Sequence, residues 1–180
     1  SIDYIDFSLS SEKRDLGGLY LRGVHSCGAL LRRSTIDMVG KMDVNYRIAW
    51  DAEYFLRFLG ESGSYLYYYH RPLTGYRKVS NSLSTNLVQM YSEKVRIYGQ
   101  IAKDFPSLKE KLGWKVKKRF ALQIISLSDA YKLKGRYAQA MWSTIKALLC
   151  YPPIVKFYYF SLLGIFFKDF RSRKTGLLKI

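Results

Sequence analysis

The sequence predicts an α/β unit followed by an α-helical extension. Up to about residue 86, strand-like and helix-like segments alternate, and from Leu87 onward apolar residues recur at the 3.6-residue period of helices. Hydrophobic residues make up 48% of the 180, enough for a packed core. We therefore expect two domains, residues 1–86 and residues 87–180.

Two segments of the first domain have the character of strands. Residues 20–33 alternate loosely between apolar and polar and contain two glycines, which is typical of one or two strands near a ligand or another backbone. Residues 64–69 (SYLYYY) are rich in tyrosine and come just before Arg71-Pro72, a turn signal.

Two helices are expected between these strands. Ser34 is predicted to be the N-cap of a short helix that ends at Gly40. Residues 51–59 place four large apolar side chains on one side at helical spacing, and Gly60 and Gly63 are expected to end that second helix.

Three apolar stripes in the second domain each predict one helix, with Pro106 and Gly135 between them. They consist of Leu87, Tyr91, Val95, Tyr98 and Ile101, then of Val116, Phe120, Ile124, Leu127 and Tyr131, and then of Tyr137, Met141, Ile145 and Leu148. We expect the three helices to pack together through these stripes.

Positive charge is concentrated in the second half of the chain. Residues 1–88 hold 11 Lys and Arg against 9 Asp and Glu, whereas residues 89–180 hold 19 against 5, in a chain of net charge +16. Such a basic region indicates an anionic partner, either phospholipid headgroups or nucleic acid. A solvated charged surface is the alternative.

The segment 154–167 (IVKFYYFSLLGIFF) is apolar nearly all round. As a helix it would be about 21 Å long, too short for a hydrocarbon core of about 30 Å. Basic residues follow it, including Lys168, Arg171 and Lys174. We expect an interfacial helix over about 154–174 on an anionic membrane surface. The alternative is a core helix of a missing domain or of a dimer.

Four short motifs, in order, resemble those of the family 2 glycosyltransferases. The basic pair Arg32-Arg33 is followed by 39–43 (VGKMD), similar to the family's "vGgfDe" turn, and by 50–57 (WDAEYFLR), similar to "EDyeLwlR". Residues 72–77 (PLTGYR), with Ser82 and Ser84, are similar to the closing "epLayYR" run and the serines after it. The resemblance covers about residues 20–86 closely and the helical tail only loosely.

The resemblance implies the C-terminal, acceptor-side part of a GT-A-like mixed-sheet domain and an inverting sugar transfer. Asp51 corresponds to the family's catalytic base, which takes a proton from the acceptor hydroxyl. Trp50, Tyr76 and Arg77 are the expected substrate-binding residues. Trp50 replaces the family's usual Glu, and Val79 stands where many members have His, a residue that can help hold the metal or the diphosphate. From the residues alone, without the resemblance, capping of its helix is the favoured role of Asp51.

No Asp-x-Asp motif for Mg²⁺ or Mn²⁺ is present in the sequence. We therefore expect the divalent metal and the nucleotide-sugar donor to be bound by another part of the parent enzyme, with no metal ligands here. The sequence starts at Ser1, without Met or a leader, which indicates that it is cut from a longer protein. On this interpretation the chain is a fragment, inactive alone, of a hexosyltransferase that acts in surface polysaccharide or lipopolysaccharide biosynthesis.

The expected location is the cytoplasmic face of the cell membrane, with peripheral attachment. Cys27 and Cys150 lack the spacing of a zinc site or a disulfide framework, which fits a reducing compartment. The alternative function is a basic helical module for nucleic acid or for oligomerisation, without catalysis. Nucleic acid is the less favoured partner, because the apolar segment 154–167 would have no use in such a protein.

Overall fold

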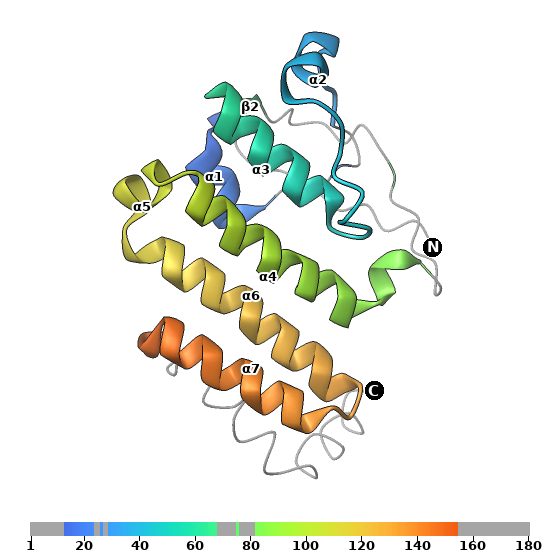
Figure 1. Cartoon of the computed structure of the whole chain (residues 1–180), viewed down its shortest axis with the longest axis vertical. Coiled ribbons are helices and arrows are strands. Elements are labelled where there is room, and N and C mark those ends of the chain that lie inside the picture. The colour runs from blue at the N-terminus through green and yellow to red at the C-terminus, as the bar shows by residue number, and fades with distance from the viewer. Residues whose placement is uncertain (1–12, 24–25, 27–28, 68–74, 76–81, 155–180) are drawn as a thin grey trace, which may run out of the picture. The chain divides into compact units, whose positions relative to one another are not determined.

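The computed structural model describes residues 13–23, 26, 29–67, 75 and 82–154. Within these residues the chain is mainly helical (Figure 1). It divides into two compact units, Ser1–Val116 and Lys117–Ile180.

The prediction of a GT-A-like mixed sheet is wrong. Among the described residues, strands are confined to β1 (Lys13–Arg14) and β2 (Leu66–Tyr67), which pair antiparallel with Lys13 opposite Tyr67. Strands of two residues form no face on which helices could pack. The large apolar side chains buried in the first unit lie on helices instead.

The expected strand at the start of 20–33 is instead the end of helix α1 (Leu16–Arg22). Asp15 caps this helix by accepting a hydrogen bond from the Gly18 N–H (2.9 Å), and Lys111 forms an ion pair with the same carboxylate. Tyr20 is fully buried, and its hydroxyl donates to the Tyr98 carbonyl oxygen at 3.1 Å. The local cap and the burial of one helical face thus outweigh the loose alternation of the sequence.

The two helices predicted in the middle of the first unit are confirmed as α2 (Arg33–Val39) and α3 (Trp50–Ser62). Ser34 is not the N-cap of α2. That position belongs to Arg32, whose side chain makes no capping bond. Gly40, with φ +80°, ends α2 as expected.

Helix α3 is the centre of the first unit and packs against α1, α2 and α4 (Leu87–Asp104). Its predicted apolar side is buried, namely Tyr54, Phe55, Phe58 and Leu59. Of the two glycines expected to end α3, Gly63 does so in a left-handed conformation, whereas Gly60 lies inside the helix. A short 3₁₀ turn, η1 (Leu83–Thr85), precedes α4, and α5 (Ser107–Leu112) follows it.

Helix α6 (Trp114–Leu133) extends into the second unit and is followed by α7 (Tyr137–Cys150) and the short turn η2 (Pro152–Ile154). The two helices form a hairpin around Gly135 (Figure 1). The buried hydroxyl of Ser128 donates to the Ala140 carbonyl oxygen at 2.8 Å and lies 2.8 Å from the Thr144 hydroxyl. The side chains at this contact, Ser128, Ala140 and Thr144, are small.

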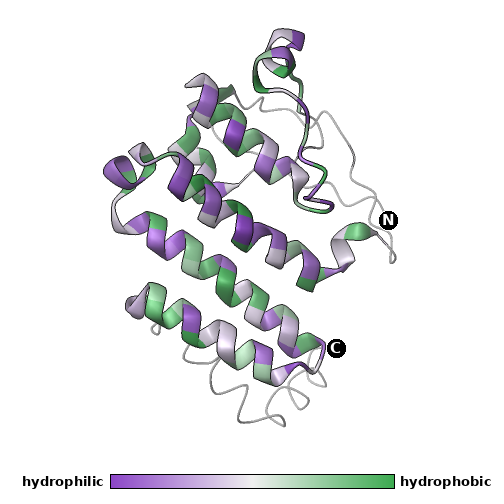
Figure 2. Cartoon of the chain, in the orientation of Figure 1, coloured by the Kyte–Doolittle hydropathy of each residue, from purple (hydrophilic) through white to green (hydrophobic). Residues whose placement is uncertain are grey.

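The apolar stripe predicted for α7 is not the buried side of that helix. Its buried residues are Ala140, Ser143, Thr144 and Ala147, whereas Tyr137, Met141 and Ile145 are 37%, 46% and 37% exposed. In Figure 2 most of the α7 ribbon is green or white, because the helix is rich in apolar residues. The hydrogen-bonded contact with Ser128 selects small residues, and the larger apolar ones face outward.

Within the described residues, no helix is both long enough and apolar enough to cross a membrane. The predicted interfacial segment 154–174 lies outside the described residues from position 155 onward.

Candidate active site

Asp51 is the second residue of α3, and backbone N–H groups hold its side chain. One carboxylate oxygen, Oδ1, accepts from the Ala52 N–H at 2.8 Å, and Oδ2 accepts from the Ser26 N–H at 3.3 Å. The side chain is half-buried, so it is not sealed inside the protein. Asp51 therefore accepts a hydrogen bond from an N–H group in the first turn of its helix and another from a chain segment 25 residues away.

The segment that leads into α3 is fixed by a buried acid on α4. Glu93 Oε2 accepts from the N–H groups of Ile48 (2.8 Å) and Ala49 (2.9 Å), and its Oε1 accepts from the Gln89 side chain (2.9 Å). Three residues further along α4, the Arg96 guanidinium lies 4.9 Å from the centre of the Tyr46 ring. Helix α4 thus sets the path of the backbone immediately before Trp50 and Asp51.

The electrostatics of Glu93 follow from these contacts. Burial alone would raise the pKa of its carboxyl group, but the hydrogen bonds from Ala49, Ile48 and Gln89 outweigh that effect and lower the pKa below its usual value. An ionised carboxylate is the stronger acceptor for backbone N–H groups.

Glu93 was not among the residues that the sequence singled out. A signal was nevertheless present, because Glu93 precedes Ile97 by four residues and Ile101 by eight, on the side of α4 that is buried. A carboxylate on an apolar helical stripe requires a partner, since an unpaired buried charge is costly.

Arg57 connects α3 to the turn that follows α2. Its guanidinium donates to the carbonyl oxygens of Val39 (2.6 Å) and Lys41 (3.1 Å). The Tyr54 hydroxyl, also on α3, donates to the carbonyl oxygen between them, that of Gly40 (3.3 Å). Three successive carbonyl groups of the 39–43 motif are therefore bound by side chains of the 50–57 motif.

Glu53 completes this arrangement and takes no part in an acid/base pair with Asp51. Glu53 instead forms an ion pair one helical turn along α3, with Arg57 Nε 2.6 Å from Glu53 Oε1. The pKa of Arg57 is raised, chiefly by this hydrogen bond.

The remaining predicted site residues are only partly described. Trp50, half-buried, precedes Asp51 at the start of α3. Tyr76 and Arg77 lie outside the described residues. Arg32 and Arg33 are exposed, and Arg33 forms an ion pair with Asp37 (3.1 Å).

Within the part of the chain that the structure describes, no group of three or more His, Cys, Asp or Glu side chains could hold a metal ion. Asp43, the acidic residue of the 39–43 motif, instead accepts hydrogen bonds from the backbone and side-chain N–H groups of Asn45, at 2.9 and 2.8 Å.

Comparison with known proteins adds no identification, because no family model, no curated protein and no solved structure matches this chain. The candidate site consequently rests on the sequence motifs and on the contacts described above.

Proposed function

We propose that this chain is the acceptor-side part of an inverting glycosyltransferase of the family 2 type. The observation that carries the proposal is the Asp51 carboxylate, half-buried at the start of α3 and oriented by the N–H groups of Ala52 and Ser26. A carboxylate fixed in this way can accept a proton from a bound hydroxyl group.

In the proposed reaction, Asp51 removes the proton of an acceptor hydroxyl as its oxygen attacks the anomeric carbon of a nucleotide sugar. The new carbon–oxygen bond forms on the face opposite the bond to the diphosphate. That second bond breaks, and the diphosphate leaves with the nucleotide. Configuration at that carbon is inverted. Holding the hydroxyl against the base supplies much of the rate, because the proton leaves only as the bond forms.

Two features of the first unit support this role for Asp51. Glu93 and Arg96 on α4 hold the backbone on one side of Trp50 and Asp51, at 46–49. Arg57 and Tyr54 hold the 39–41 turn against α3. Together these contacts limit movement of the residues around the proposed base, as positioning requires.

Trp50 is proposed to stack on a sugar ring of the acceptor, and Tyr76 and Arg77 to bind substrate, with Arg77 opposite a phosphate group. The acceptor is a glycan or a lipid-linked glycan, and the protein acts from the cytoplasmic membrane face. Peripheral attachment through the sequence 154–174 is part of the proposal, as are the nucleotide-sugar donor and its divalent metal in another part of the parent enzyme.

The proposal is tested by a transfer assay with the parent protein that contains this chain. Membranes from cells that express the parent protein are incubated with a panel of nucleotide sugars and Mg²⁺ or Mn²⁺. The glycan products are analysed by mass spectrometry and NMR. We expect one donor to give a product of inverted anomeric configuration, and this chain alone to give none. Product with retained configuration, or no transfer from any donor while the parent is folded, would exclude the mechanism.

A further inference from the structure

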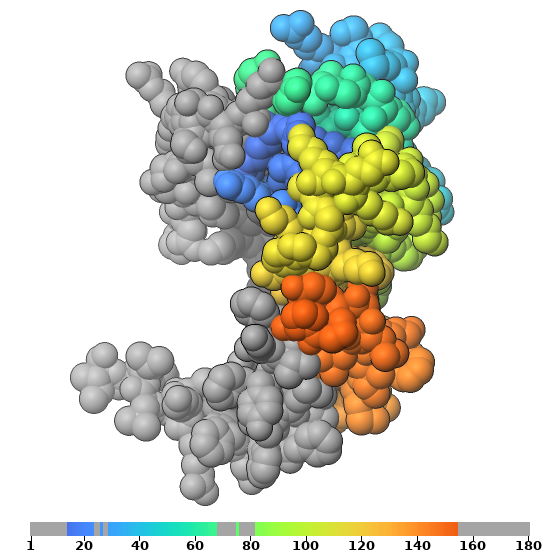
Figure 3. Space-filling model, turned by 90° about the vertical axis from the view of Figure 1, so that its left-hand side faces the viewer, coloured from blue at the N-terminus to red at the C-terminus, as the bar shows by residue number. Residues whose placement is uncertain are grey.

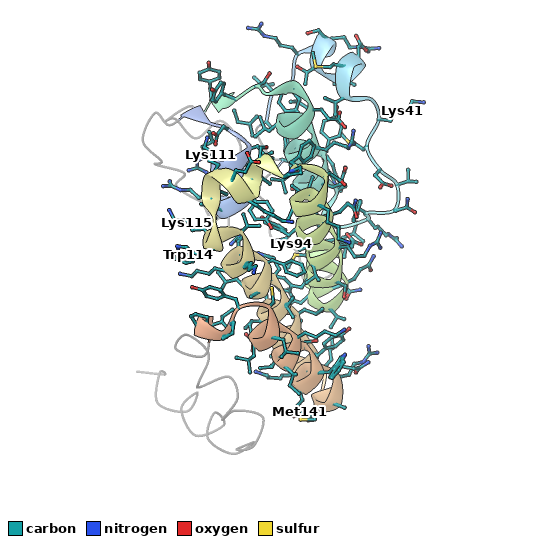
Figure 4. All side chains as sticks on the ribbon, turned by 60° about the vertical axis from the view of Figure 1, so that its left-hand side comes forward. Lys41, Lys94, Lys111, Trp114, Lys115 and Met141 are labelled. Atoms are coloured by element: carbon teal, nitrogen blue, oxygen red, sulfur yellow. The ribbon has the colours of Figure 1, made fainter. Side chains whose placement is uncertain are left out.

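Helix α7 carries its large apolar side chains on its exposed side. We refer to them as the α7 apolar face, which consists of Tyr137, Met141, Trp142, Ile145 and Leu149, with exposed fractions from 37% to 78%. In the space-filling view α7 lies at the surface, in orange (Figure 3). Figure 4 shows Met141 extending outward from this helix.

The spacing of these residues makes the face continuous. Tyr137, Met141, Ile145 and Leu149 follow one another at intervals of four, so their side chains line up along one side of the helix. Trp142 lies beside them, three residues before Ile145. The 14 residues of α7 give the face a length of about 21 Å.

The surroundings of the face are strongly basic. Residues 114–150 contain eight Lys and Arg and a single acidic residue, Asp129. Lys134 and Arg136, both exposed, come just before the face begins, and Lys146 lies over the Trp142 ring at 5.4 Å from its centre. This composition matches helices that lie in the membrane interface, with Trp and Leu on one side and Lys and Arg beside them.

A lipid surface fits these features better than a protein surface does. Lysine is depleted in protein–protein interfaces, whereas anionic headgroups attract it. Tyrosine and tryptophan are enriched at the headgroup boundary, where one end of the ring is apolar and the other meets water. In the sequence, the face is followed directly by the apolar and basic stretch 154–174.

We propose that the α7 apolar face docks onto an anionic lipid bilayer with the helix parallel to the membrane plane. This inference rests on the peripheral attachment in the proposed function and assigns a further, structured contact to it. Docking places the apolar side chains among the upper acyl chains and the neighbouring Lys and Arg side chains at the phosphate groups.

The test measures partition of the full chain onto vesicles of phosphatidylglycerol and phosphatidylcholine. Met141→Glu/Ile145→Glu changes two residues of the face, and Ile36→Glu/Met42→Glu is its control. Ile36 and Met42 match Ile145 and Met141 in residue type and in exposed fraction, which is 39% and 48% against 37% and 46%. We expect the first variant to lose about tenfold or more in partition and the control to stay within about twofold of the unchanged chain.

A second measurement does not depend on these variants. In the Trp50→Phe/Trp114→Phe background Trp142 is the one remaining tryptophan, and we expect brominated lipids to quench its fluorescence. Equal partition of the two Glu variants, or an unquenched Trp142, would overturn the proposal. So would a dimer of the unchanged chain that Met141→Glu/Ile145→Glu dissociates, because the face would then bind a second copy. Vesicle binding is measured without sugar transfer, so either proposal can fail while the other stands.

Discussion

Two carboxylates near the start of α3, Asp51 and Glu93, have different surroundings. Both oxygens of Glu93 accept hydrogen bonds, and its side chain is buried beneath the segment before α3. Asp51 is half-buried, and its bond to the Ser26 N–H is long, at 3.3 Å. Glu93 is therefore suited to holding the backbone, whereas Asp51 keeps acceptor capacity for the proposed substrate hydroxyl.

Glu93→Gln tests the first of these roles. The neutral amide retains one oxygen acceptor but loses the charge that strengthens the bonds to Ile48 and Ala49. We expect the free energy of unfolding at pH 7 to fall by about 1–3 kcal/mol, measured by urea denaturation.

The pH dependence of the same variant has a defined sign. Because the pKa of Glu93 is lower in the folded protein than its ordinary value of 4.5, its stabilisation is present above pH 4.5 and is lost as the pH falls through the folded pKa. Glu93→Gln should therefore lose less stability than the unchanged protein between about pH 5 and pH 3. Parallel pH profiles of the two proteins would contradict this account.

At the scale of elements, the coupling of α3 to the α2 turn depends on the planar guanidinium of Arg57. Lysine at this position keeps the charge and a contact with Glu53, but its single ammonium group cannot reproduce the paired bonds to Val39 and Lys41. For Arg57→Lys we expect about 1–3 kcal/mol of destabilisation. Amide hydrogen exchange in α2, measured by mass spectrometry, should be faster than in the unchanged protein, and exchange in α7 serves as the internal reference. Unchanged exchange in α2 would show that the Arg57 hydrogen bonds do not stabilise this helix.

Gly60 sits inside α3 because Phe105 packs directly on it. A Cβ atom at this position would lie 2.3 Å from the Phe105 ring, far closer than a van der Waals contact. Alanine is the better helix former by about 1 kcal/mol, yet we expect Gly60→Ala to lower stability by about 1–3 kcal/mol through overpacking.

A double variant separates these two effects in thermal denaturation. Phe105→Leu removes the ring, so adding Gly60→Ala to it should cost less than the same change costs in the unchanged protein. Strictly additive losses would rule out the steric explanation.

The sequence predicted the helices well where apolar residues recur every three or four positions over many residues, as in α3, α4 and α6. The prediction was wrong over 20–22, because Asp15, which caps α1, precedes this segment, and because Tyr20 is buried by Tyr98, 78 residues away. The stripe on α7 was misassigned for a related reason. Periodicity locates an apolar side but does not reveal that small residues form the contact.

The same limit applies to the candidate site. Motif order indicated Asp51, and the spacing of four residues between Glu53 and Arg57 is that of an ion pair along one helix. Glu93 lies 42 residues beyond Asp51, so its contacts with Ile48 and Ala49 could not be read from local patterns. The mixed sheet was expected from the resemblance, and the contacts of the described residues instead build a helical unit around α3.

At the scale of the whole molecule, the two compact units have different proposed tasks. The first contains Asp51 and the contacts that position it, and the second contains the α7 apolar face. Charge follows the same division, with an excess of +5 over residues 1–116 (17 minus 12) and of +11 over residues 117–180 (13 minus 2). A basic second unit on an anionic membrane would hold the first near a lipid-linked acceptor.

The most direct test of this account is the rate of sugar transfer by the parent protein with Asp51→Asn, compared with Asp37→Asn, an exposed carboxylate on α2. Asparagine keeps the size of the side chain but cannot take the proton. We predict that kcat falls by about 10²–10⁴-fold with Asp51→Asn, with the acceptor KM and the thermal stability little changed. The Asp37→Asn control should retain full activity, and a kcat for Asp51→Asn within about twofold of that control would contradict the assignment of Asp51 as the base.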